Sequence, residues 1–135
     1  MGIEFPNLPY LIDGDIKITQ SLAIPKYIAR RSGKTDLLGK TPKDMALVDN
    51  FLYMFEDILT QLIELVCNKK WEDERTSVFY KLKSKFQKIE NFIQQKKFVI
   101  GYLTIADFAL AEGSLYIQRN FYEEYNQFKS IQLVR

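Results

Sequence analysis

Two short motifs near the start of the chain have the residue types of a peptide-binding site: the corner Asn7-Leu8-Pro9 and the pair Gln20-Ser21. A cis bond before Pro9 would turn the amide and carbonyl of Leu8 outward, where a peptide ligand can pair with them. Ser21 stands where we expect a helix to start, and the free N–H groups there favour a carboxylate, which the Gln20 amide can also bond. Each motif alone is equally well an ordinary turn or helix cap, but together they favour a ligand site.

The composition excludes the commonest catalytic groups. The 135 residues contain no His, so Ser-His-Asp triads, Cys-His pairs and His-ligated metals cannot be built from them. Cys67 is the sole cysteine, which excludes an internal disulfide and a cysteine-rich zinc site. We expect no metal site, and we expect Cys67 to be a small buried residue.

The composition is that of a soluble globular chain, with 47% hydrophobic and 27% charged residues. Its length suits one domain or pieces of two. No apolar run approaches the ~20 residues of a membrane span, and the opening residues lack the pattern of a signal peptide. A cytoplasmic protein without membrane insertion is the expectation.

The elements that must hold the two motifs are a hairpin and a helix. Asp13-Gly14 lies between two runs of β-forming residues, which predicts two short antiparallel strands. The apolar spacing over 21–31 predicts a helix with Ser21 as its N-cap, ending at a Ser-Gly pair. Residues 1–31 therefore form a predicted ββα unit.

A helical domain is predicted after a polar connector at 32–41. Thr41, Pro42 and Asp44 are the N-cap, N1 and N3 residues of a helix expected over 42–68, which has apolar residues on more than one side. Further helices are expected over 76–95 and 105–118.

The expected helix 105–118 has distinct start signals. Thr104 and Asp107 form a capping box, and Leu103 and Phe108 occupy the positions of a hydrophobic staple. This helix is apolar nearly all round, which predicts a central place in the bundle. Residues 119–135 show no finished helical pattern, and the helical domain as a whole is predicted over 42–135.

At residues 5–14 and 18–24 the sequence resembles the cytosolic glutathione S-transferases, most clearly the mu class, with some sigma-class features. The likeness continues more weakly through 38–49 and 98–108. The resemblance implies an α+β fold, in which part of a thioredoxin-like domain precedes an all-helical domain.

The resemblance also implies a ligand, glutathione, and residues that bind it. The corner Asn7-Leu8-Pro9 would hold the cysteinyl part, and Gln20-Ser21 the γ-glutamyl end. Asp57 falls on the acid that reaches the glutathione amine across the mu-class dimer; a solvated helix residue is the plain alternative.

For the dimer, Phe5 corresponds to a side chain that inserts into the partner subunit, with packing on its own hairpin as the alternative. Lys26 and Asp49 correspond to charges that pair near the two-fold axis. A homo-oligomer, or association with a related chain or larger complex, is therefore expected.

The family's thiolate-stabilising Tyr, Ser or Cys lies on a strand that precedes the matched region, and no residue here corresponds to it. Tyr10 cannot replace it, because Tyr10 follows the predicted cis proline. We therefore expect partial glutathione binding, no catalytic residue within this chain, and little or no activity of the chain alone.

Two other functions compete with this one. The chain would serve as a non-catalytic structural subunit if the open edge of its hairpin accepted a strand from a larger assembly. Binding of nucleic acid through the lysines of 69–100 fits poorly, because the aromatic residues there have the spacing of a helix core. We expect no nucleic-acid partner.

Overall fold

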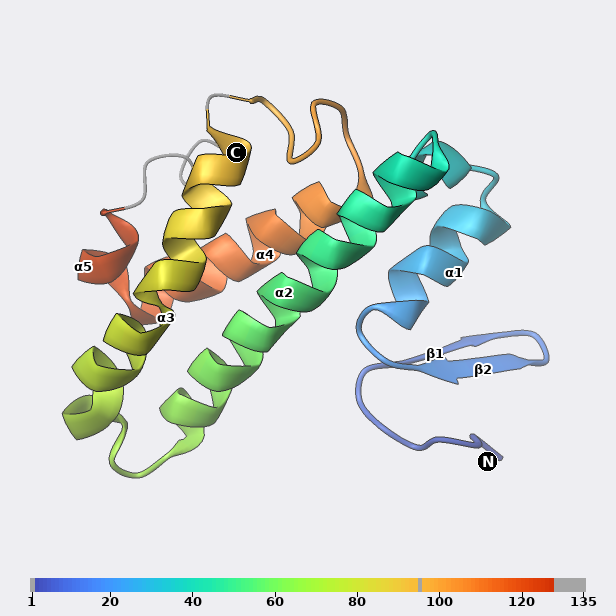
Figure 1. The fold of residues 1–135 in the computed structure, drawn as a ribbon. Helices are drawn as coiled ribbons and strands as arrows, with labels where there is room; N and C mark the ends of the chain where they lie inside the picture. The colour runs from blue at the N-terminus through green and yellow to red at the C-terminus, as the bar shows by residue number, and fades with distance from the viewer. Residues whose placement is uncertain (1, 95, 128–135) are drawn as a thin grey trace.

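The computed structural model describes residues 2–94 and 96–127 and has the expected α+β fold (Figure 1). A two-stranded sheet and one helix lie on one side of a long helix, α2, and the rest of the bundle packs on its other side. The elements are, in order, β1 (Tyr10–Asp13), β2 (Ile16–Thr19), α1 (Ala23–Arg31), the 3-10 turn η1 (Thr35–Leu38), α2 (Pro42–Cys67), α3 (Trp71–Ile93), α4 (Ile105–Asn120) and α5 (Tyr122–Tyr125).

The predicted hairpin is confirmed. β1 and β2 pair antiparallel with Tyr10 opposite Thr19, and Gly14 takes the positive φ of +58° that the tight turn requires. Helix α1 is tied to this turn, because the Tyr27 hydroxyl donates to Asp13 over 2.8 Å and the Arg31 Nε lies 3.4 Å from the same carboxylate oxygen.

The predicted role of Ser21 as the N-cap of this helix is wrong. Helix α1 begins at Ala23, and no side-chain hydrogen bond caps it. Gln20 has a φ of +80°, which turns its carbonyl toward the N–H groups of Ala23 and Ile24 at 3.1 Å each. The backbone turn at Gln20 thus starts the helix and leaves the Ser21 hydroxyl free to bond elsewhere.

Helix α2 is the centre of the bundle, and its predicted start is confirmed. The Thr41 side chain accepts a 3.1 Å hydrogen bond from the Asp44 N–H, and Pro42 is the first helical residue. The helix contacts both α3 and α4. Its buried face consists of Val48, Phe51, Leu52, Phe55, Ile58, Leu62 and Leu65. Cys67, at its end, is exposed rather than buried as expected, because it lies off this face.

Helix α3 begins five residues before the predicted start at 76. The Asn68 carbonyl accepts from the Trp71 N–H over 3.1 Å, and three acidic residues follow in the first turn, where they complement the helix dipole. The apolar positions that guided the prediction appear only from Phe79 onward, so the polar first turns carried no periodic signal.

The capping box at the start of α4 is confirmed: the Asp107 carboxylate accepts from the Thr104 N–H and the Val99 N–H, each over 2.7 Å. The central place predicted for this helix is only partly correct, because Phe108 remains 57% exposed and Leu103 is exposed as well. Residues 122–125 form the short helix α5, whose Tyr125 is buried with the preceding Phe121.

The side chain of Tyr102 holds the connector between the hairpin unit and the bundle in place. The Lys40 N–H donates to the Tyr102 hydroxyl over 2.8 Å, and the Lys40 ammonium lies 4.7 Å from the centre of the same ring. Burial, and next the bond with Asp44, raise the Tyr102 pKa above its usual 10, although the bond from the Lys40 N–H acts in the opposite direction. No helix in the described part of the chain is long and apolar enough to cross a membrane.

Candidate functional site

The hairpin brings the two sequence motifs to one end of the sheet. Because Tyr10 lies opposite Thr19, the residue before Tyr10 and the residue after Thr19 lie at the same end. The Thr19 hydroxyl, on a side chain that is only 6% exposed, donates a 2.8 Å hydrogen bond to the carbonyl oxygen of Phe5. This bond holds the Asn7-Leu8-Pro9 corner beside Gln20.

The peptide bond between Leu8 and Pro9 is cis, as the resemblance implied. The Leu8 N–H is not vacant, however, because it donates to the side-chain oxygen of Asn7 over 2.9 Å at an exposed position. A ligand carbonyl that used this N–H would take the place of the Asn7 oxygen, and the Asn7 amide would then be available for a second contact.

Ser21 is joined to the long helix. Its hydroxyl donates a 2.5 Å hydrogen bond to Oε1 of Glu56, a residue 35 positions later on α2. Sequence reasoning had placed a bound carboxylate at Ser21, and the structure places a carboxylate there that belongs to the chain itself. Glu56 therefore brings negative charge to the place where a ligand's charged end was expected.

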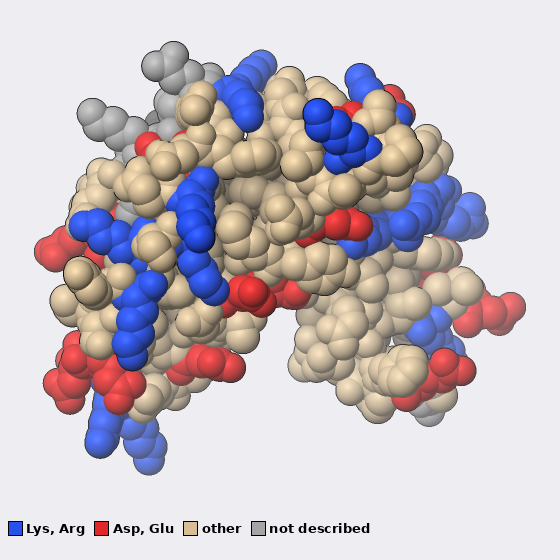
Figure 2. All heavy atoms as spheres, in the orientation of Figure 1, with Lys and Arg blue, Asp and Glu red and all other residues tan. Residues whose placement is uncertain are grey.

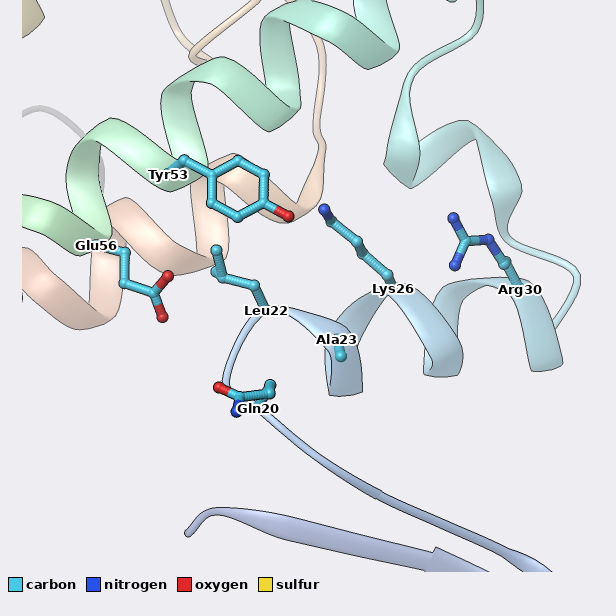
Figure 3. Close-up of a pocket in the computed structure, with 7 residues that line it drawn as sticks. All are labelled: Gln20, Leu22, Ala23, Lys26, Arg30, Tyr53 and Glu56. Carbon is cyan, nitrogen blue, oxygen red and sulfur yellow. The ribbon is translucent and has the colours of Figure 1, made fainter. Parts of the chain in front are cut away.

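A pocket of about 360 Å³ opens between the start of α1 and α2 (Figure 3). Gln20 and Glu56 lie at one end of it, and Lys26 and Arg30 approach from α1. The ring of Tyr53 lies beside Lys26, whose ammonium is 4.9 Å from the ring centre. Charges of both signs thus line one pocket, which is the arrangement that suits a zwitterionic head group carrying an ammonium and a carboxylate.

The two residues that the resemblance placed at a dimer axis pair with each other within one chain. The Lys26 ammonium lies 2.9 Å from Oδ1 of Asp49, and the Lys26 side chain is largely buried while that of Asp49 is half exposed. This ion pair joins α1 to α2 directly, close to the pocket.

Two other predicted residues lie away from this pocket. Asp57 is exposed on α2 and is not among the residues that line it, although it follows Glu56 in the sequence. Phe5 is 76% exposed and does not pack on its own hairpin. Both side chains are therefore accessible to a second molecule.

Sequence reasoning missed Thr19 and Glu56. Thr19 was identifiable as the last residue of the second strand, where an inward side chain can reach a neighbouring segment. Glu56 had no local signal, because its contact with Ser21 depends on how α1 packs against α2. Among the described residues, no group of His, Cys, Asp and Glu side chains is arranged to hold a metal ion.

Comparisons with known proteins agree with this geometry. Residues 3–30 match the N-terminal domain of glutathione S-transferases. The mu-class 26 kDa isozyme of Schistosoma mansoni is 36% identical over 114 residues, which are 84% of this chain and 51% of that protein. Glutathione S-transferase 2 of Gallus gallus is 36% identical over 122 residues, which are 90% of this chain and 54% of that protein.

The crystal structure of the glutathione S-transferase Blo t 8 is similar over 99% of this chain and 64% of its own, with a TM-score of 0.81 and 31% identity. The chain spans about half the length of the curated relatives it matches.

Proposed function

We propose a function for this chain from its resemblance, in sequence and fold, to the mu-class glutathione S-transferases. We propose that it binds glutathione between its hairpin and α2, and that it does not itself activate the glutathione thiol. The observation that carries the proposal is the Thr19 bond to Phe5, because it sets the Asn7-Leu8-Pro9 corner beside Gln20 and Ser21. One extended tripeptide can contact both motifs only when they share an end of the sheet.

Each part of glutathione has a candidate partner in this arrangement. The cysteinyl backbone would pair with Leu8 beside Pro9, with the Asn7 amide displaced to a supporting contact. The γ-glutamyl carboxylate would bond Gln20 and replace Glu56 as the acceptor of the Ser21 hydroxyl proton, and Glu56 would then face the ligand's ammonium. Glu56 thus adds an acid from the same chain to the Asp57 that the resemblance assigns from a partner.

Activation of the thiol is a separate requirement. A thiol with its ordinary pKa of about 8.5 is mostly protonated at neutral pH, and a transferase lowers that pKa with a hydrogen bond to the thiolate. We propose that no residue of this chain supplies that hydrogen bond. We propose weak glutathione binding, in the millimolar range, and negligible conjugation by this chain alone.

Association with a second copy or a related chain belongs to the same proposal, with Phe5 as the anchoring side chain and Lys26 and Asp49 near the contact. We also propose that the functional units are 1–31 and 42–135, joined by 32–41, and that the protein works in the cytoplasm.

A non-catalytic structural subunit is the second candidate function. In the described residues the sheet has two strands, and Tyr10, Ile12 and Ile16 expose 53%, 44% and 43% of their surfaces. An apolar, unpaired strand edge is a template for a strand from another protein.

Titration of the 135-residue chain with glutathione, followed by NMR, tests the proposal. We expect shifts at Leu8, Gln20 and Ser21 below ~10 mM and roughly tenfold weaker binding for Glu56→Gln, because a charged hydrogen bond contributes about 1.5–3 kcal/mol. Glu64→Gln, an exposed acid on α2, is the matched control.

An analogue of glutathione without the α-ammonium separates the roles, since it should bind wild type and Glu56→Gln alike. No shifts at these residues would leave the structural subunit as the function. Rapid conjugation of a standard electrophile by the pure chain would contradict the absence of a thiolate-stabilising group.

A further inference from the structure

The turn that ends α1 carries an exposed serine among basic side chains. Ser32 is the C-cap residue of this helix, and Arg30, Arg31 and Lys34 are exposed around it. Figure 2 shows basic side chains gathered around this end of α1. Among the described residues, neither Arg30 nor Lys34 has a carboxylate within ion-pair distance. A segment with these charges fits a partner whose binding groove is acidic.

The Ser32 hydroxyl has a structural role in this turn. It donates to the carbonyl oxygen of Ile28 over 2.8 Å, and the carbonyl oxygen of Ala29 lies 3.3 Å away. Both carbonyls belong to the last turn of α1, at the negative end of the helix dipole. The same turn is tied to the hairpin, because the Arg31 Nε lies 3.4 Å from a carboxylate oxygen of Asp13. A negative group on the Ser32 oxygen would therefore affect the helix end and its contact with the hairpin.

A second exposed serine with basic neighbours lies on α3, and the fold distinguishes the two. Ser84 lies between Lys83 and Lys85 in the middle of α3. A protein kinase binds the residues beside its target hydroxyl as an extended segment, so Ser84 would be accessible only if the centre of this long helix opened. Residues 32–34 already lie outside a helix, and Ser32 needs only the last turn of α1 to open. The structure thus favours Ser32 as a target.

We propose that Ser32 is a phosphorylation site for a protein kinase that selects basic residues on both sides of its target. The Ser32 oxygen attacks the γ-phosphorus of ATP bound to the kinase, an O–P bond forms, the bond from this phosphorus to the β-γ bridging oxygen breaks, and ADP leaves. The hydroxyl proton passes to the catalytic base of the kinase. Arg30 and Lys34, two positions before and two positions after the serine, are the charges that such a kinase recognises. The proposal does not involve glutathione and therefore does not rest on the proposed function.

A phosphate at this position would loosen the end of α1. It carries a charge of about −1.5 to −2 at pH 7, and its formation removes the proton that Ser32 donates to Ile28. The phosphate oxygens are repelled by the helix carbonyls and attracted by Arg31, in competition with the ion pair to Asp13. Phosphorylation would thus weaken the contact between α1 and the hairpin, with the Tyr27 bond to Asp13 still in place.

Incubation of the 135-residue chain with MgATP and the catalytic domain of protein kinase C, which prefers basic residues at these two positions, tests the site. We expect about one phosphate per chain, assigned to Ser32 by mass spectrometry of its peptides. Ser32→Ala should lower incorporation about tenfold or more, and Lys34→Gln should slow it about threefold or more, because the substrate loses an attractive charge. Ser84→Ala, the matched control on α3, should be phosphorylated like the wild type.

Hydrogen exchange before and after phosphorylation tests the consequence. The amides of Ser32, Gly33 and Lys34 donate to carbonyls of α1 over 2.9, 3.1 and 2.9 Å, and they should exchange about tenfold faster or more in the phosphorylated chain. Amides in the middle of α3 should not change. No incorporation, or phosphate on Ser84 or Thr35 in place of Ser32, would overturn the proposed site. Unchanged exchange at these three amides would overturn the proposed loosening.

Discussion

The Thr19 hydroxyl and the Phe5 carbonyl oxygen lie 2.8 Å apart, although the two residues are fourteen positions apart in the sequence. The bond closes the loop that contains the cis proline and fixes where this corner lies relative to the second strand. The position of the candidate binding motifs therefore depends on one buried hydroxyl group.

Thr19→Val should separate the two motifs. The substitution keeps the side-chain shape but leaves the Phe5 carbonyl without its donor, at a cost of about 1–2 kcal/mol in the free energy of unfolding. Glutathione affinity should fall further than this stability loss alone explains. Urea unfolding and NMR titration measure the two effects, with the exposed Thr76→Val as the matched control. Unchanged affinity in Thr19→Val would show that the corner is held by other contacts.

Phe5→Ala should weaken association between chains. A phenyl ring that is 76% exposed and becomes buried in a partner contributes roughly 2–4 kcal/mol. Sedimentation at tens of micromolar should show dimers for wild type and mostly monomers for the variant. Tyr122→Ala, which removes an exposed ring from α5, outside the expected interface, should leave the dimer intact. A monomeric wild type would contradict the proposed interface.

The ion pair between α3 and α5 predicts a pH dependence. Burial raises the Glu124 pKa, but three effects together outweigh burial and hold this pKa below its ordinary 4.5: the hydrogen bonds from Arg75 at 2.8 and 3.1 Å, a backbone hydrogen bond and the charge of Arg75. A lowered pKa in the folded state stabilises the fold above about pH 4.5, and that stability is lost as the pH falls through the folded pKa.

Urea unfolding between pH 3 and pH 7 should therefore show a loss of about 1–2 kcal/mol on the acid side, from a charged hydrogen-bonded pair. Glu124→Gln should lower stability at pH 7 and flatten this part of the profile. Glu123→Gln, an exposed neighbour, should retain the wild-type slope. The same slope in Glu124→Gln would assign the pH dependence to other carboxylates.

Asp107→Asn should destabilise the bundle by about 2–4 kcal/mol. The buried carboxylate accepts from two backbone N–H groups, and an amide can offer only one oxygen to them. Hydrogen exchange of the Val99 and Thr104 amides should accelerate first. A change below about 0.5 kcal/mol would mean that the box is not needed to start α4.

Gly113→Ala should also destabilise the chain, although alanine normally favours a helix. A Cβ at this position would overlap the ring of Phe55 where α2 and α4 cross, and overpacking costs about 1–3 kcal/mol. Because the closest overlaps are with the Phe55 ring and a smaller one is with Leu59, Phe55→Leu should recover part of the loss in the double variant. Thermal unfolding of the four proteins of this cycle measures the coupling.

Much of this architecture was predictable because its signals are local. The turn at Asp13-Gly14, the Thr41 cap and the capping box at Thr104 depend on residues within four positions of one another, and the structure has all three. The cis bond before Pro9 was anticipated from the resemblance to the glutathione S-transferases. The predicted start of α3 failed because its polar first turns carry no apolar period, and that of α1 failed because the backbone turn at Gln20, and not the Ser21 side chain, starts the helix.

The composition of the candidate site was less predictable, because its geometry depends on contacts between elements. Ser21 was expected to cap its own helix, but its hydroxyl reaches Glu56 across the interface with α2. Lys26 and Asp49 were expected to pair near a two-fold axis, and within this chain they form an ion pair that joins α1 to α2. Which charged side chains become partners depends on how whole helices pack together. The order of residues along one helix does not specify that packing.

The hairpin unit has almost no interior of its own. Among the described residues of 1–31, only Thr19 and Ala29 are buried, and the unit is joined to α2 through Ser21 and Lys26. A two-stranded sheet is at best marginally stable alone, so the pocket exists only in molecules whose hairpin unit is docked. Apparent affinity is the intrinsic affinity multiplied by this docked fraction, and a fraction of about one in ten weakens it about tenfold. Docking of the hairpin unit onto α2 thus sets the apparent affinity of the site. A ligand that contacts both the hairpin unit and α2 shifts undocked molecules toward the docked state.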